Sequence, residues 1–86
     1  MYETPDIIEV KALKEYYIYI KFKNGEEKVY NMEGLINNIK FFHKLKKRKY
    51  FENVHPRGDT VEWKNGEDVA PEDLYYDSIP FSKWEN

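Results

Sequence analysis

Hydrophobic and polar residues alternate most clearly over Tyr16–Lys23, where the even positions are apolar and the odd positions are Tyr or Lys. A period of two residues is typical of a β-strand that buries one face. Asn24-Gly25 follows directly, and this dipeptide is the strongest short-range signal for a hairpin. The pattern therefore predicts a strand that ends in a two-residue type I′ turn.

This turn also predicts a register for the return strand over residues 26–31. A two-residue loop places Lys23 opposite Glu26 and Ile20 opposite Val29, which pairs opposite charges and apolar side chains. A run rich in β-branched residues at Ile7–Leu13 predicts a preceding strand. We expect these segments to form a three-stranded antiparallel meander.

Helical spacing replaces the alternation after Asn31, whose side chain can accept hydrogen bonds from the first free backbone N–H groups of a helix. Apolar residues then recur at positions typical of one helix face, namely Met32, Leu35, Ile36 and Ile39. A second short helix is predicted within residues 41–51, with Phe41 and Leu45 on its buried side.

The second half of the chain contains a further hairpin signal. Val61 and Trp63 lie two residues apart, so they share one face of a predicted strand, and we expect Trp63 to be in the core. Asn65-Gly66 then predicts another type I′ turn, with Lys64 opposite Glu67. Two strand segments and this hairpin make a second small antiparallel element.

Pro71 favours the start of a last short helix, because the first helical position needs no N–H group. Residues 77–86 predict an irregular tail that carries Phe81 and Trp84. The chain of 86 residues is expected to be a single domain, residues 1–86, with its core at about residues 6–76. The predicted fold class is α+β: a small antiparallel sheet, comprising the meander and a C-terminal hairpin, with two or three short helices.

Composition excludes several classes of protein. Cysteine is absent, which rules out disulfides and thiolate chemistry. No apolar run is long enough to span a bilayer, and the N-terminal residues do not resemble a secretory signal. We therefore expect a cytoplasmic protein without membrane contact, whose 17% aromatic content helps a small domain to bury enough surface.

The net charge of −2 conceals an asymmetry, because residues 1–49 carry +4 and residues 50–86 carry −6. One basic run stands out, at Lys44, Lys46, Lys47, Arg48 and Lys49. A solvated helix face is the ordinary interpretation of such a run. A phosphate-binding patch and a docking surface for an acidic partner are the alternatives.

Three tyrosines form the sharpest candidate for a partner-binding site. If the even positions of the strand at 16–23 face the core, Tyr17 and Tyr19 lie on the opposite face, and the predicted hairpin places Tyr30 beside Tyr19. Such a face is either covered by Phe81 and Trp84 of the tail or left as a contact for another protein or a second copy. Stacking of nucleic-acid bases is a third interpretation.

No set of catalytic, metal-binding or cofactor-binding residues is apparent. His43 and His55 are too far apart for usual zinc-ligand spacing, and no cysteine accompanies them. Ser78 and Ser82 lack the context of a catalytic nucleophile. The acidic residues near the C-terminus are explained by capping and hairpin pairing; they are Glu67, Asp68, Glu72, Asp73 and Asp77. We expect no enzyme, metal or cofactor.

Four stretches of the chain together carry a family resemblance, namely Phe22–Gly25, Asn31–Ile36, Phe51 and above all Val61–Tyr75. Across roughly residues 6–76 they resemble a small bacterial family, domain of unknown function 2442 (DUF2442). The resemblance implies a compact α+β domain. Relatives resemble members of two-gene cassettes, which suggests a toxin–antitoxin arrangement. Family members often carry Asp where Asn24 and Asn31 stand here, so a carboxylate site at these positions is not expected.

The leading functional interpretation is a non-catalytic protein-interaction or regulatory module, with the antitoxin-like half of a two-gene cassette as its specific form. Its partner would be another small protein or a second copy of the chain. The alternative is a nucleic-acid-binding accessory domain that uses the basic run at residues 44–49.

Overall fold

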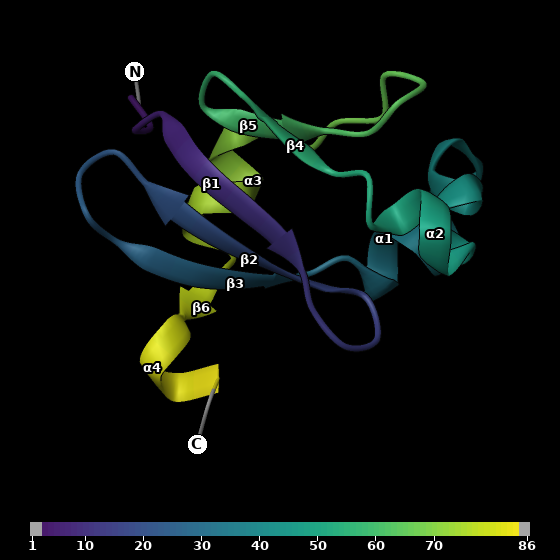
Figure 1. The fold of residues 1–86 in the computed structure, drawn as a ribbon, viewed down its shortest axis with the longest axis horizontal. Helices are drawn as coiled ribbons and strands as arrows, with labels where there is room; N and C mark the ends of the chain where they lie inside the picture. The colour runs from purple at the N-terminus through teal and green to yellow at the C-terminus, as the bar shows by residue number, and fades with distance from the viewer. Residues whose placement is uncertain (1–2, 85–86) are drawn as a thin grey trace.

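A four-stranded antiparallel sheet forms the centre of the computed structural model, which describes residues 3–84 (Figure 1). Its strand order is β1-β2-β3-β6. Strands β4 and β5 pair separately as a two-stranded sheet beside β1. The strands are β1 (Ile7–Ala12), β2 (Tyr17–Phe22), β3 (Glu27–Asn31), β4 (His55–Arg57), β5 (Thr60–Glu62) and β6 (Ile79–Pro80).

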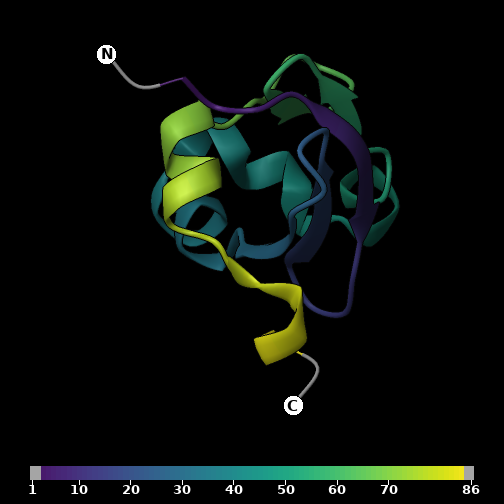
Figure 2. The ribbon, with the colours of Figure 1, turned by 90° about the vertical axis from the view of Figure 1, so that its left-hand side faces the viewer.

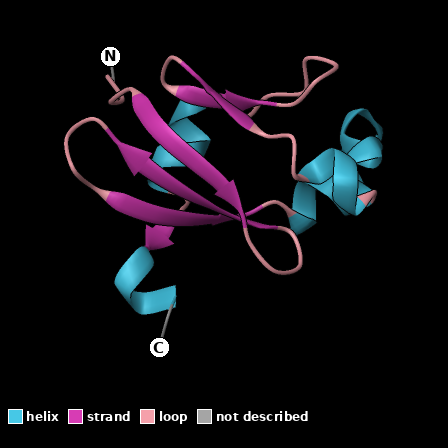
Figure 3. Cartoon of the chain, viewed as in Figure 1, coloured by secondary structure: helices cyan, strands magenta, loops and turns pink. Residues whose placement is uncertain are grey.

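Short helices occupy most of the remaining chain, as the colouring in Figure 3 shows. They comprise α1 (Glu33–Asn38), the 3₁₀ helix η1 (Lys40–Lys46), α2 (Arg48–Phe51), α3 (Pro71–Tyr76) and α4 (Phe81–Trp84). The α+β class is confirmed, with more short helices than the sequence predicted. None of the helices within residues 3–84 is long and apolar enough to cross a membrane.

The alternation along β2 has the predicted consequence. Ile18, Ile20 and Phe22 are fully buried and belong to the main core cluster. Tyr17 and Tyr19 lie on the opposite face, because successive side chains of a strand point to opposite sides of the sheet. This arrangement gives the sheet two faces that both carry apolar residues.

The predicted register of the first hairpin is wrong by one residue. Phe22, and not Lys23, pairs with Glu26, so that the loop contains three residues. Gly25 has a φ of 94°, whereas the only non-glycine residue with positive φ in the described part of the chain is Glu15. A type I′ turn needs positive φ at both central residues, and Asn24 does not supply it. The loop therefore has the form of a three-residue hairpin with glycine in the left-handed region.

The same correction applies to the second hairpin. Trp63 N–H donates to Glu67 O at 2.9 Å, which leaves Lys64 inside a three-residue loop rather than opposite Glu67. Gly66 again has a φ of 94°. The return segment beyond this loop pairs only through an isolated bridge between Glu62 and Asp68, so the predicted C-terminal hairpin lacks a full second strand.

The helical region between β3 and β4 differs in its period from the prediction. Asn31 Oδ1 accepts a hydrogen bond from Glu33 N–H at 3.0 Å, next to the start of α1. In η1, Phe42 and Leu45 are buried, whereas Phe41 is 56% exposed. Side chains three residues apart share one side of a 3₁₀ helix, which explains why Phe42 and Leu45 face the core together.

The C-terminal residues are not the irregular tail that the sequence predicted. After α3, the chain adds β6 to the outer edge of β3 through the pairs Lys28–Pro80 and Val29–Ile79. It then ends its described part in α4, which lies apart from the other helices in Figures 1 and 2.

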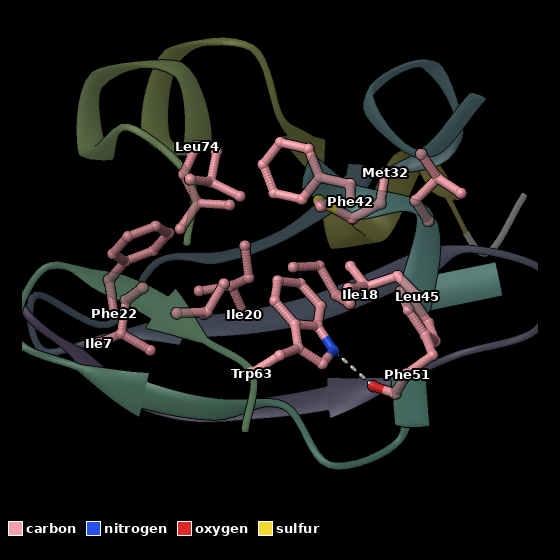
Figure 4. Packing of buried hydrophobic residues seen from close by; sticks show 13 residues of the cluster. Ile7, Ile18, Ile20, Phe22, Met32, Phe42, Leu45, Phe51, Trp63 and Leu74 are labelled. Carbon is pink, nitrogen blue, oxygen red and sulfur yellow. Dashed lines mark hydrogen bonds between the residues drawn. The ribbon is translucent and has the colours of Figure 1, made fainter. Parts of the chain in front are cut away.

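Trp63 lies at the centre of the main core, as predicted (Figure 4). It is fully buried, its ring stacks on Phe51 at 5.8 Å between centroids, and its Nε1–H donates to Phe51 O at 2.8 Å. This bond satisfies the indole N–H, which would otherwise be costly to bury. Leu74 of α3 closes the cluster from the side opposite the sheet.

Candidate interaction surfaces

The second apolar face of the sheet is formed by Tyr17, Tyr19 and Val29, and we call it the tyrosine face. Tyr19 is 9% exposed and Val29 is 2% exposed, yet neither belongs to the main core cluster. Their cover comes from α4. The ring of Phe81 contacts that of Tyr19 at 5.0 Å between centroids, and the ring of Trp84 lies 6.0 Å from that of Tyr17.

Tyr30 does not belong to this face, contrary to the predicted position beside Tyr19. The observed register places Tyr30 opposite Ile18 and Val29 opposite Tyr19. Tyr30 consequently packs against the main core, on the side of α3. Burial raises the pKa of its phenol, and the charges of Asp73 and Asp77 act in the same direction.

A shallow hollow beside the tyrosine face has a volume of about 340 Å³ and is lined by Glu9, Lys11, Leu13, Tyr19, Glu27 and Phe81. The Tyr19 hydroxyl donates to Glu27 Oε2 at 2.5 Å, and Lys11 Nζ lies 3.1 Å from Glu9 Oε2. Burial, followed by the bond to Glu27 and the charge of Glu9, raises the pKa of Tyr19 to about 12. The phenol therefore stays protonated near neutral pH, and its O–H group donates to Glu27.

The basic run is divided between two helices. Lys44 and Lys46 lie on η1, Lys47 connects it to α2, and Lys49 lies on α2. All four lysines are exposed, and none of their ammonium groups has an ion pair or hydrogen bond with another described residue.

Arg48 differs from these lysines because its guanidinium is engaged inside the chain. It donates to Leu13 O at 2.6 Å and to Glu15 O at 2.5 Å, and it pairs with Glu52 at 3.0 Å. These contacts fasten α2 to the loop between β1 and β2. Arg48 therefore stabilises the fold by joining α2 to the loop between β1 and β2, a role that could not be predicted from the sequence.

Two apolar side chains were not expected on this surface. Ile39 is 42% exposed and Phe41 is 56% exposed, and both adjoin the lysines. In a 3₁₀ helix, Phe41 and Lys44 share one side because they are three residues apart. We call Ile39, Lys40, Phe41, Lys44, Lys46 and Lys47 the η1 surface. The Phe41-Phe42 pair in the sequence could have indicated that one aromatic side chain would be exposed here. Which of the two is exposed depends on the helix type.

The remaining candidate residues have contacts within the chain or lie apart from one another. His55 approaches Glu62 at 3.3 Å, while His43 is exposed on η1. Glu67 is 3% exposed and accepts a hydrogen bond from the Tyr50 hydroxyl at 2.6 Å. Glu72 and Asp73 lie in the first turn of α3. No group of three potential metal ligands occurs within residues 3–84.

The Tyr50–Glu67 contact is a structural feature that sequence reasoning missed. The Tyr50 oxygen also accepts from Asn65 N–H at 2.9 Å, so that one hydroxyl joins α2 to the second hairpin. Burial raises the pKa of Tyr50, and its bond to Glu67 raises it further. The arrangement stabilises the loop that follows Trp63.

Taken with the fold, these surfaces define a small α+β domain that offers one covered aromatic face and one exposed basic–apolar surface. A family model described as a protein of unknown function (DUF2442) matches residues 7–80, so the chain belongs to the DUF2442 family. No curated protein matches the chain. No solved structure matches it.

The positions at which this chain departs from the resemblance have a local explanation. Asn24 Oδ1 accepts from Glu26 N–H at 3.0 Å, just as Asn31 Oδ1 accepts from Glu33 N–H. An aspartate oxygen can accept the same bond two residues on, because both residue types form this kind of turn. Asn and Asp can therefore accept the same backbone bond at these positions, although Asn24 also donates through Nδ2 to Glu26 Oε1 at 2.6 Å, which an aspartate could not do.

Proposed function

We propose that this chain is a non-catalytic protein-interaction module that binds an acidic partner protein through the η1 surface. One observation carries the proposal: Ile39 and Phe41 are exposed among lysines that have no anionic partner among the described residues. Exposed aromatic and aliphatic side chains within a polar rim are typical of protein-binding surfaces.

The charge distribution supports an acidic partner. Residues 40–49 contain six basic residues and no acidic residue, and only Arg48 forms an ion pair with a described residue. Neighbouring like charges reduce stability, and a complementary partner relieves this repulsion. The lysines would steer association and set specificity, while Phe41 would supply most of the affinity.

The specific form of this proposal is a regulatory role. Relatives in this family resemble members of two-gene cassettes. The protein encoded by the neighbouring gene is therefore the first partner to test, and this chain would be the antitoxin-like member of the pair. No reaction is assigned to the chain. Support for this comes from the structural contacts of Tyr19, which donates to Glu27, and of Tyr50, which donates to Glu67.

Binding to the neighbouring gene's product, measured by calorimetry, tests the proposal. Phe41→Ala should weaken binding at least tenfold, because central apolar anchors usually contribute more than about 1.4 kcal/mol. Ile39→Ala should weaken it less. Ile8→Ala is the matched control, since Ile8 is 55% exposed on β1, away from this surface. Equal affinities for the Phe41→Ala variant and the wild type would contradict the proposal.

Charge reversal supplies an independent test. The double variant Lys44→Glu with Lys47→Glu should slow association strongly, and the loss should shrink as salt is added. Lys23→Glu with Lys64→Glu is the charge-matched control, because both lysines are exposed on the two hairpin loops. The control should retain most of the association rate.

A nucleic-acid-binding accessory domain is a second candidate, because Phe41 stands between Lys40 and Lys44 on the same exposed helix. Aromatic residues interleaved with lysines suit stacking on single-stranded bases. Anisotropy with a labelled oligonucleotide distinguishes the two candidates. Micromolar binding at physiological salt that falls steeply with added salt, and is lost in the Lys44→Glu/Lys47→Glu variant, would favour nucleic acid over protein.

A further inference from the structure

We propose that the C-terminal segment, residues 79–84, is exchangeable between two copies of the chain. The tyrosine face and the adjoining edge of β3 would then be a docking site for the same segment of a second copy. This inference is independent of the η1 surface. It rests on a contrast between how weakly the segment is held and how much apolar surface it covers.

The segment is attached by a short strand pairing and by side-chain contacts at its two rings, including Lys14 Nζ at 5.6 Å from the centre of the Trp84 ring. β6 pairs with β3 at only two residue pairs, and α4 is a helix of four residues without a buried member. Ile79 is 44% exposed although it lies in the sheet. Segments with few buried contacts open locally at a small cost in free energy.

The surface beneath the segment, in contrast, is apolar and almost fully covered. Tyr19 is 9% exposed and Val29 is 2% exposed, and the aromatic contacts of Tyr17 and Tyr19 come from Trp84 and Phe81. Opening the segment would expose these side chains together with the edge of β3. An extended apolar patch and a free strand edge favour association.

The chemistry of this site specifies its occupant. A ligand must add a two-residue strand to β3 and then place two aromatic rings over Tyr19 and Tyr17. Residues 79–84 do both in the closed chain, as Figure 2 shows for the path from α3 to α4. A second copy of the chain offers the identical segment, so it fits without any new contact.

The hinge is placed by the contacts of α3. Lys28 Nζ donates to Tyr75 O at 2.8 Å and lies 4.3 Å from the centre of the Tyr75 ring, and Leu74 is fully buried. These contacts keep α3 in place when the segment opens. Asp77 and Ser78 remain as the connection, and a short connection of this kind is a usual hinge for segment exchange.

Two full-length variants test the exchange directly. The receiver carries Phe81→Ala and Trp84→Ala, so it keeps the tyrosine face but lacks its own aromatic cover. The donor carries Tyr17→Ala and Tyr19→Ala, so it keeps the segment but lacks the face. We expect each variant alone to be monomeric and an equimolar mixture to form a one-to-one dimer in sedimentation equilibrium.

Matched controls define the result. A chain with all four substitutions should not pair with either variant. If donor and receiver each show a cooperative urea transition, and their mixture remains monomeric, the proposal is refuted.

A second measurement keeps the test decisive if the donor does not fold. A fluorescein-labelled peptide of residues 78–84 should bind the full-length receiver. It should bind the wild type at least about 100-fold more weakly, because the wild type's own segment competes at an effective concentration on the order of millimolar. Tyr17→Ala added to the receiver should weaken peptide binding. Equal binding by wild type and receiver, or no binding to a folded receiver, would overturn the proposal.

Discussion

The guanidinium of Arg48 donates a hydrogen bond to the backbone oxygen of Glu15, the one non-glycine residue within 3–84 that has positive φ. Glu15 has a φ of 55°, in the left-handed region that costs a side-chain-bearing residue about 1–2 kcal/mol. Arg48 also binds the oxygen of Leu13, so the loop between β1 and β2 is held at two points.

We expect Arg48→Met to lower the free energy of unfolding by about 1–2 kcal/mol, because hydrogen bonds from a charged donor are lost while the partly exposed loop regains water. Urea denaturation measures this change. Lys49→Met is the control, and it should fall within about 0.5 kcal/mol of the wild type. Similar losses for the two variants would show that the Arg48 contacts are not stabilising.

Trp63 gives the largest expected loss. Trp63→Ala should cost about 3–5 kcal/mol, since it leaves a cavity in the main core and removes the donor to Phe51 O. A domain of this size has little stability to spare, so the variant should be largely unfolded at 25 °C. Circular dichroism checks this outcome. A cooperative melt near the wild-type temperature would place the residue outside the core.

The two hairpin glycines should be sensitive to substitution for a reason of backbone geometry alone. A Cβ at Gly25 or Gly66 meets no atom within 4 Å, yet both residues have a φ of 94°. Gly66→Val should therefore cost about 1–3 kcal/mol through strain. Gly34→Ala in α1 should instead stabilise the protein by about 0.5–1 kcal/mol. Thermal melts of the two variants should move in opposite directions.

Stability should fall at alkaline pH. The pKa of Tyr19 is raised to about 12 from an ordinary value of 10.0, so its contribution is complete below pH 10 and is lost as the pH rises towards 12. The pKa values of Tyr50 and Tyr75 shift in the same direction. Urea denaturation between pH 8 and pH 12 measures the decline, and Tyr19→Phe should make it shallower. An unchanged slope in this variant would contradict the assignment.

The strands and the central core residue could be predicted because their signals are local and strong. Alternation over β2 identified its buried face, and the spacing of Val61 and Trp63 identified a core strand. Pro71 correctly marked the start of α3. In each case, hydrophobic periodicity and backbone preference favour the same structure, so no distant contact was needed to decide.

The tyrosine face and the η1 surface depended on finer choices. An Asn-Gly sequence suits both two-residue and three-residue loops, and the choice moves Tyr30 from one face of the sheet to the other. Phe41 and Phe42 exchange their exposure according to whether the helix is α or 3₁₀. The strand β6 is only two residues long, so it has no periodicity of its own and forms through its contact with β3.

The position of Pro80 has a consequence for how the sheet can grow. Pro80 stands in the outermost strand and has no N–H group to offer a further strand, while at the opposite edge Ile7 N–H is bonded to Gly58 O at 2.8 Å. Both edges are thus protected against indefinite strand addition. If two copies exchange their C-terminal segments, each docked segment brings its own proline to the edge. Growth of the sheet beyond the docked segment would then be blocked at Pro80 in each copy.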